Sequence, residues 1–295
     1  MDDAGSTALD LRAALAACDL GDVLDLSPLP GEHANQPHIV TAGAGRFLAK
    51  VLSPRLSAPP TVQLRHAFVA HLASRGVRVP QFVTTRNGDP VVHAKGRAIE
   101  VQKFIGGSTL RGDDPADALL AGEALAAVHR AGADFTPPQG AAARDALSFQ
   151  EDLRGLDRLE QQMQTYLPAP EVLQSVEAVR RALLSSAREL ANADLPVGVV
   201  HGDFGPESLV RDKEGLVWVT DFDACGWAPL LLDVADLIRA FGRGALAAYE
   251  QRRPLTEAER ALAPTASRMA SIHRELARGT GVEMIAQRLA CEASL

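Results

Sequence analysis

Two acidic motifs carry the residue types in this sequence that are best suited to chemistry. The first is His201-Gly-Asp203 and the second is Asp221-Phe222-Asp223. A short apolar run that favours a β-strand precedes each motif. Carboxylates placed together in loops indicate either a metal site or an acid/base pair. We therefore expect Asp203 and Asp221 to lie close together.

The segment between the motifs predicts a hairpin. The polar stretch Arg211-Asp-Lys-Glu-Gly215 has the length of a turn between antiparallel strands, and it separates the run Val199-Val200 from the run at residues 216–220. Such a hairpin would bring both carboxylates to one end. The alternative is that the acids are solvated residues of ordinary turns, an interpretation that two motifs at this spacing disfavour.

The pair of motifs resembles the catalytic loop and the metal loop of the aminoglycoside phosphotransferase family, which has the protein-kinase fold and includes homoserine and choline kinases. The resemblance implies that Asp203 orients and deprotonates a substrate hydroxyl. It implies that Asp221 holds the Mg²⁺ ions that bridge the nucleotide phosphates. Asp223 is implied to touch metal or backbone, and Asp233 to brace the catalytic loop through hydrogen bonds to its backbone.

Three positions depart from the family pattern, and one of them is Gly205, which stands where many relatives carry a His. Ser208 stands where the family has an Asn as second metal ligand, and its hydroxyl is a poorer but possible ligand for Mg²⁺. In the helix predicted over Val62 to Ser74, Arg65 stands where the family has a Glu that pairs with a strand lysine. Three explanations stay open: the alignment is shifted, the lysine pairs elsewhere, or the active arrangement is weakened.

Lys50 lies in the apolar run RFLAKVL, where a charge is costly unless it is paired. One interpretation is an edge-strand lysine whose ammonium reaches solvent. The other is the family lysine that contacts the α- and β-phosphates of ATP or GTP. The segment before Gly106-Gly107 resembles the family's hinge, whose backbone binds adenine. Its predicted nucleotide contacts are Gln102, Lys103, Phe104 and Ile105.

The resemblance implies an α+β, bilobal protein-kinase-like fold, and the order of the expected elements agrees with it. Strand patterns from Val23 onward, interrupted by one helix, predict a small antiparallel N-lobe of five strands. Helical periodicity beyond Asp113 predicts a mainly helical C-lobe. We place a nucleotide-binding lobe at residues 1–101, the hinge at 102–108, and the catalytic and substrate lobe at 109–295.

The segment between hinge and catalytic loop is where the family forms its substrate pocket. Two long helices are predicted there, over Ser148 to Leu167 and Glu171 to Ala193. His129, at the end of a helix predicted over Ala116 to Arg130, is interpreted as a packed histidine because no partner is evident in the sequence. The acceptor stays open between sugar-like antibiotics, amino alcohols and homoserine-like acids.

Composition argues against several other classes of protein. The chain has 295 residues, 46% of them hydrophobic, and a formal net charge of -7. The negative charge disfavours nucleic acid as a partner. The chain has no run of eighteen apolar residues and begins with an acidic segment, so we expect no membrane partner and a cytoplasmic location. The cysteines Cys18, Cys225 and Cys291 lack the spacing of a zinc or disulfide framework.

We therefore predict an ATP- or GTP-dependent, Mg²⁺-requiring kinase that phosphorylates a hydroxyl of a small molecule. One alternative is a pseudokinase-like protein that binds nucleotide or a small molecule without turnover, which Ser208 and Arg65 favour. Another is a kinase fold adapted to different chemistry, such as transfer or elimination on a phosphorylated metabolite. The Mg²⁺ dependence of nucleotide binding tests the first alternative, and the mass of the product tests the second.

Overall fold

The chain divides into two compact units. The computed structural model describes residues 11–30, 37–54, 56–139, 170–277 and 281–292. Unit 1 contains Met1–Thr109, Asp134–Ala143 and Glu207–Asp223, and unit 2 contains the remainder. The lobes at 1–101 and 109–295 stay a prediction. The units differ from them because Glu207–Asp223 groups with unit 1.

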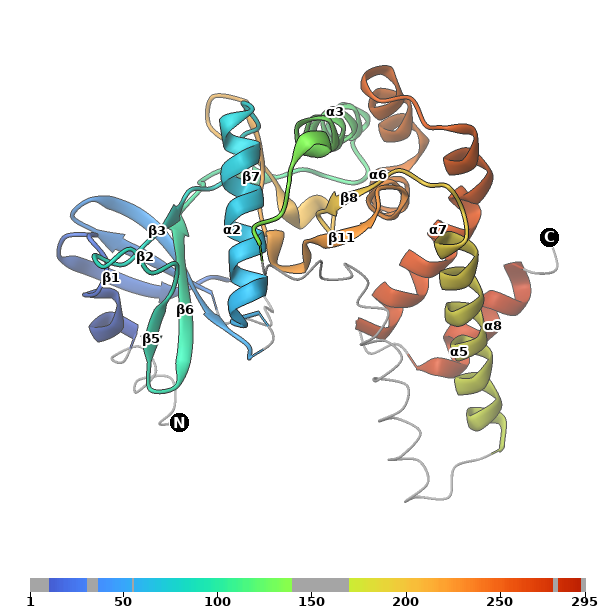
Figure 1. Ribbon diagram of the computed structural model, residues 1–295, viewed down its shortest axis with the longest axis horizontal. Coiled ribbons are helices and arrows are strands. Elements are labelled where there is room, and N and C mark those ends of the chain that lie inside the picture. The colour runs from blue at the N-terminus through green and yellow to red at the C-terminus, as the bar shows by residue number, and fades with distance from the viewer. Residues whose placement is uncertain (1–10, 31–36, 55, 140–169, 278–280, 293–295) are drawn as a thin grey trace. The chain divides into compact units, whose positions relative to one another are not determined.

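Unit 1 is built on an antiparallel sheet (Figure 1). Its six strands are β1 (Val23–Pro28), β2 (His38–Ala42), β3 (Gly45–Leu52), β4 (Phe82–Val83), β5 (Val92–Ala94) and β6 (Arg97–Lys103). The strand order is β1-β2-β3-β6-β4, and β5 also pairs with β6. The predicted fold class is confirmed, and the sheet has six strands where five were expected.

The strand β3 lies between β2 and β6 and alternates between two faces of the sheet. Phe47, Ala49 and Val51 are buried in a cluster that includes Leu11 and Leu15. Those two leucines come from a short helix at residues 11–15. Because β3 is an inner strand of the sheet, the edge-strand interpretation of its lysine is wrong.

Helix α2 (Pro59–Ser74) is the helix inserted into this sheet. It begins with prolines at its first positions, where a missing N–H costs nothing. Val62 packs against Leu52 and Ala98 of the sheet, and Phe68 is fully buried. These contacts fix which face of α2 is turned toward β3 and β6.

The predicted hairpin between the two acidic motifs is wrong. In unit 1, β10 (Val217–Val219) pairs with β9 (Leu209–Arg211), which also pairs with β7 (Ser108–Thr109). In unit 2, β8 (Val197–Val200) pairs with β11 (Gly226–Pro229). The three-residue β9 follows a 3₁₀ turn, η2 (Pro206–Ser208), and carries no recognisable strand pattern. The polar turn therefore closes a shorter hairpin than the one expected.

Unit 2 is mainly helical in the part that the structure describes. Its helices are α3 (Pro115–Ala131), α5 (Pro170–Ala191), α6 (Leu231–Arg252), α7 (Glu257–Ala277) and α8 (Val282–Glu292). Helix α3 packs against α6, and α5 packs against α7 and α8 (Figure 1). The helix predicted over Ser148 to Leu167 lies outside the described residues. None of the described helices has both the length and the apolar character that a membrane span requires.

Candidate active site

Asp203 lies in the loop after β8, where a glycine bends the backbone. Gly202 has φ of 84°, and a Cβ there would lie 2.4 Å from the carbonyl oxygen of Ala224, so glycine is required. The Asp203 side chain is 60% exposed and forms an ion pair with Arg274 of α7. The carboxylate is thus accessible to a hydroxyl group and oriented by a cation.

The acid Asp233, fully buried in α6, holds this loop in place. Its carboxylate accepts hydrogen bonds from the N–H of His201 at 2.6 Å and the N–H of Gly202 at 2.9 Å. Burial raises the pKa of Asp233, but the hydrogen bond and charge of His129 outweigh burial and hold the pKa below its usual range. His129 lies 3.1 Å from Asp233 and 2.8 Å from the hydroxyl of Tyr249. The interpretation of His129 as a packed histidine is therefore confirmed, and the structure adds partners that the sequence did not reveal.

Asp221 and Asp223 converge on the ammonium group of Lys50. The Nζ atom of Lys50 lies 2.6 Å from Oδ1 of Asp221 and 3.2 Å from Oδ1 of Asp223. Burial lowers the pKa of Lys50, but the two carboxylates outweigh burial and raise it above its usual value. Asp221 has φ of 63°, a left-handed conformation that few non-glycine residues adopt. The buried ring of Phe222 anchors this segment by an edge-to-face contact with Phe68 of α2.

This arrangement suits a magnesium ion that a nucleotide shares. Mg²⁺ in such sites takes one or two carboxylates together with phosphate oxygens, and the Lys50 ammonium shows that Asp221 and Asp223 already surround one cation. Within the described residues, no group of three or more His, Cys, Asp or Glu side chains is placed to hold a metal. Ser208 is buried, and its carbonyl accepts the N–H of Thr220 at 2.7 Å, which places it beside Asp221. Its role as second ligand stays a prediction.

Helix α2 presents a buried arginine where an acid was expected. Nε of Arg65 donates to Oε2 of Glu100 on β6 at 2.9 Å, and Nε2 of His66 lies 2.8 Å from the same oxygen. Of the three open explanations, the structure shows that Lys50 pairs elsewhere, with Asp221. Sequence reasoning missed Glu100. The signal for it was a single acid inside the apolar run of an inner strand.

The predicted hinge residues lie at the end of β6. Gln102 is buried, and Lys103 is exposed. The N–H of Phe104 donates to the carbonyl of Arg46 at 3.1 Å, and the Arg46 guanidinium lies 4.5 Å from the centre of the Phe104 ring. Ile105 is half-buried. Contacts of these residues with adenine stay predictions.

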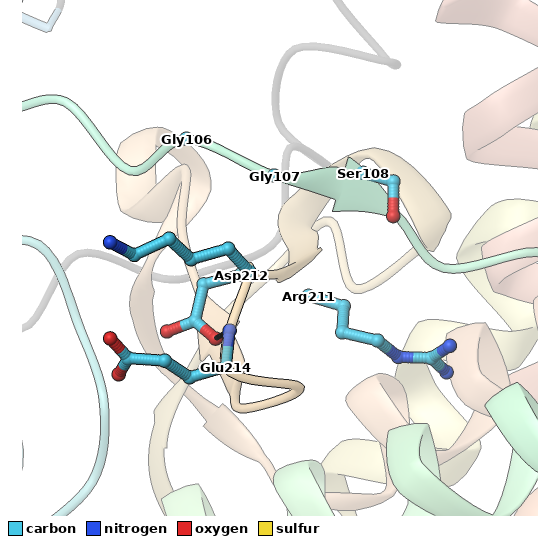
Figure 2. Close-up of a pocket in the computed structure, with 7 residues that line it drawn as sticks. Gly106, Gly107, Ser108, Arg211, Asp212 and Glu214 are labelled. Atoms are coloured by element: carbon cyan, nitrogen blue, oxygen red, sulfur yellow. Dashed lines mark hydrogen bonds between the residues drawn. The ribbon is translucent and has the colours of Figure 1, made fainter.

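A cavity of about 490 Å³ borders the glycines that follow the hinge residues. It is lined by Gly106, Gly107, Ser108 and the turn Arg211–Glu214. Figure 2 shows the carboxylates of Asp212 and Glu214 on one side of this turn, with the Arg211 side chain pointing the other way. A Cβ at Gly107 would lie 2.1 Å from the carbonyl oxygen of Arg211, so only glycine allows this backbone contact. The described lining residues of this cavity include neither Asp203 nor the group formed by Lys50, Asp221 and Asp223.

A second cavity, of about 360 Å³, lies in unit 2. Four arginines line it: Arg239, Arg268, Arg274 and Arg288. Among its described lining residues Glu275 is the one acid, and it pairs with Arg288 at 2.6 Å. Arg239 pairs with Asp236, whose pKa burial raises to about 6 against the opposing effect of that arginine. Because Arg274 also contacts the carboxylate of the catalytic loop, this basic cavity adjoins the candidate base.

Residues 25–266 match the sequence model of the phosphotransferase enzyme family. The chain belongs to this family. It is therefore an enzyme that transfers a phosphoryl group to a hydroxyl of a small molecule. Homoserine kinases of Brucella ovis and Rhodopseudomonas palustris are similar to this phosphotransferase. They are 27% identical over 282 and 285 residues, which cover 92% and 91% of this chain and 83% of each kinase.

Solved structures share the fold of this phosphotransferase. A microcompartment-associated aminopropanol kinase has a TM-score of 0.71 and 20% identity, over 96% of this chain and 97% of its own. The amicoumacin kinase hAmiN, solved with AMP-PNP, Ca²⁺ and Ami, has a TM-score of 0.74 and 16% identity, over 98% and 96%. At these identities the likeness establishes the protein-kinase-like fold and leaves the acceptor open.

Proposed function

We propose that this phosphotransferase transfers the γ-phosphoryl group of Mg²⁺-bound ATP to the hydroxyl of a small acceptor that carries an acidic group, such as a homoserine-like hydroxy amino acid. The observation that carries the acceptor class is the arginine-lined cavity adjoining Asp203. Arginine binds carboxylates through paired hydrogen bonds. A cationic antibiotic or amino alcohol would meet repulsion there. The named relatives that are 27% identical are homoserine kinases, in agreement with this class.

The nucleotide side of the reaction rests on residues of unit 1. Asp221 is the principal ligand that would hold Mg²⁺, with Asp223 and Ser208 as further ligands. Lys50 would contact the nucleotide phosphates. Mg²⁺ bound there supplies charge that offsets the phosphate oxygens during transfer. The support is that these carboxylates already gather a cation between them.

The acceptor side rests on residues of unit 2. Asp203 would orient the acceptor hydroxyl and take its proton as the bond to phosphorus forms. Arg274 contacts Asp203 and lines the basic cavity, so one acceptor molecule can place its hydroxyl at the base and its acidic group among the arginines. Arg268 is half-buried in this cavity and forms no ion pair with any described residue. It is therefore the best-placed cation for the acidic group.

We expect ATP to bind with Mg²⁺ dependence, and Asp221→Ala to remove that dependence. Loss of the carboxylate should weaken Mg²⁺ affinity by about 10- to 100-fold or more. Calorimetric titration of ATP and GTP, each with and without Mg²⁺, measures the effect and the preference between the nucleotides. Asp25→Asn, at an exposed acid of β1, is the control and should bind as the unsubstituted chain does. Binding that ignores Mg²⁺ would instead favour a binding protein without turnover.

We expect Arg268→Gln to raise the KM for homoserine by about 10- to 100-fold, because a charge-assisted hydrogen bond is worth roughly 1.5–3 kcal/mol. The value of kcat should change little, since the substituted residue does not touch the reacting hydroxyl. Arg260→Gln is the control, because Arg260 lies on the same helix but pairs with Glu250 outside the cavity. Product mass must show the gain of one phosphate. Equal turnover of 1-amino-2-propanol, which lacks the carboxylate, would count against the acceptor class.

A further inference from the structure

A third carboxylate, that of Glu100, faces Lys50 in unit 1. Glu100 stands directly opposite Lys50 in the ladder between β3 and β6. Directly opposed residues of antiparallel strands have their Cβ atoms about 4.5–5.5 Å apart and point to the same face of the sheet. The ammonium group is therefore flanked by Asp221 and Asp223 and has Glu100 as its cross-strand neighbour.

Only one of the two carboxylate oxygens of Glu100 has hydrogen-bond partners among the described residues. Its side chain is 1% exposed. Oε2 accepts from Nε and Nη2 of Arg65 and lies 2.8 Å from Nε2 of His66. Oε1 is buried and has no hydrogen-bond partner among the described residues. A buried carboxylate oxygen without a donor is costly, so the site is shaped for a donor that reaches it in another state of the enzyme.

Metal binding creates the need for such an acceptor. A metal ion on Asp221 and Asp223 competes with Lys50 for the same carboxylate oxygens. The Lys50 side chain is only 9% exposed, so its ammonium cannot simply return to water when it gives up those contacts. The free oxygen of Glu100 is the available anionic partner on the same face of the sheet.

We propose that Glu100 is the positioning residue that receives Lys50 when Asp221 and Asp223 take up Mg²⁺, and that Arg65 and His66 hold its carboxylate in place. This rests on the proposed function, because it takes Asp221 as a metal ligand and Lys50 as a phosphate contact. The helix α2 then supplies the side chains that orient an acid, while the acid itself comes from a strand.

The test is a double-mutant cycle on Mg²⁺ affinity. Glu100→Gln keeps the shape of the side chain and removes its charge. Titration of Mg²⁺ into the ADP-bound full chain should show affinity lowered by about 10- to 100-fold, the range for residues that support metal ligands. In a Lys50→Met background the same substitution should change affinity less than about twofold, because coupled residues lose their mutual effect when one is absent. An equal effect in both backgrounds would overturn the proposal.

A matched control separates this role from simple stabilisation. Glu259 is also fully buried and accepts from an arginine, Nη2 of Arg253, at 2.9 Å, but it lies in unit 2. Glu259→Gln should lower the melting temperature without changing Mg²⁺ affinity. Loss of Mg²⁺ affinity in this control as well would show that damage to any buried ion pair has the same result, and would overturn the proposal.

A second variant covers the case in which Glu100→Gln fails to fold, since that change leaves Arg65 buried without its acid. Arg65→Leu combined with Glu100→Leu replaces the whole pair by apolar side chains, which folded proteins tolerate well. It should melt near the unsubstituted chain and show the same loss of Mg²⁺ affinity. Nucleotide binding that ignores Mg²⁺ in the unsubstituted chain would overturn the proposed function. Mg²⁺-dependent binding that both Glu100 variants retain in full would overturn the role of Glu100 alone.

Discussion

Asp203→Asn is expected to lower kcat by about 100- to 10,000-fold, the range for loss of a positioned general base. The amide has the size of the carboxylate but cannot take the proton of the acceptor hydroxyl. The side chain is 60% exposed and its ion-pair partner is Arg274, so its loss should change the melting temperature little. A large fall in kcat with an intact fold is the signature of a residue that acts on the reacting atoms.

Steady-state kinetics at saturating ATP and acceptor measure this effect, and calorimetry should show unchanged affinity for Mg²⁺ and ATP. The control is Asp113→Asn, because Asp113 is 74% exposed and also pairs with an arginine, Arg111, at 3.0 Å. Its kcat should equal that of the unsubstituted chain. If Asp203→Asn keeps more than a tenth of the original kcat, Asp203 is not the base.

Asp233→Ala is expected to lower the free energy of unfolding by about 3 kcal/mol or more, because each buried donor left without an acceptor costs roughly 1–3 kcal/mol. The donors that lose their acceptor are the N–H groups of His201 and Gly202, together with the ring of His129. Because the pKa of Asp233 is held below its usual range, this stabilisation is present above about pH 4 and is lost as pH falls through the folded-state pKa.

Urea unfolding followed by circular dichroism measures the loss of stability. Asp117→Ala is the matched control, because Asp117 is a buried helix acid that accepts a backbone hydrogen bond, from Arg111 at 2.8 Å. It should cost about 1 kcal/mol. Equal losses in the two variants would mean that the loop after β8 does not depend on Asp233 for its conformation. Residual activity of Asp233→Ala should be low even in the folded fraction, since the loop carries the proposed base, Asp203.

Local sequence was enough to single out the acids of the candidate site and to predict the strand that carries Lys50. Acids that directly follow apolar runs stand out, and a lysine inside such a run indicates a buried charge with a partner. The partner itself depends on how distant segments pack. The metal role of Asp221 and Asp223 stays a prediction, and the structure shows that they pair with the lysine. The closeness of Asp203 to Asp221 stays a prediction, because the two residues belong to different units.

The misses have a common physical cause, which is that pairing between distant segments leaves no local pattern. The three-residue β9 is shorter than the strand periodicity needs to show itself, so β10 was paired with the wrong strand. The contact of His129 with Asp233 joins helices α3 and α6, and either residue alone looks like an ordinary helix position. The arginines of the basic cavity lie on helices α6, α7 and α8, and helical spacing alone cannot tell which of them converge.

Lys50 and Glu100 are directly opposite each other in the antiparallel pair of β3 and β6. In protein kinases the lysine pairs with an acid on a helix, and displacement of that helix separates the pair and silences the enzyme. On the role proposed for Glu100, strand pairing fixes the backbone spacing of lysine and acid, and α2 acts on the pair only through the contacts of Arg65 and His66 with the acid. A slip of one residue between β3 and β6 would turn them to opposite faces. On that role, displacement of α2 would release the side chain of the acid but leave its backbone position opposite the lysine unchanged.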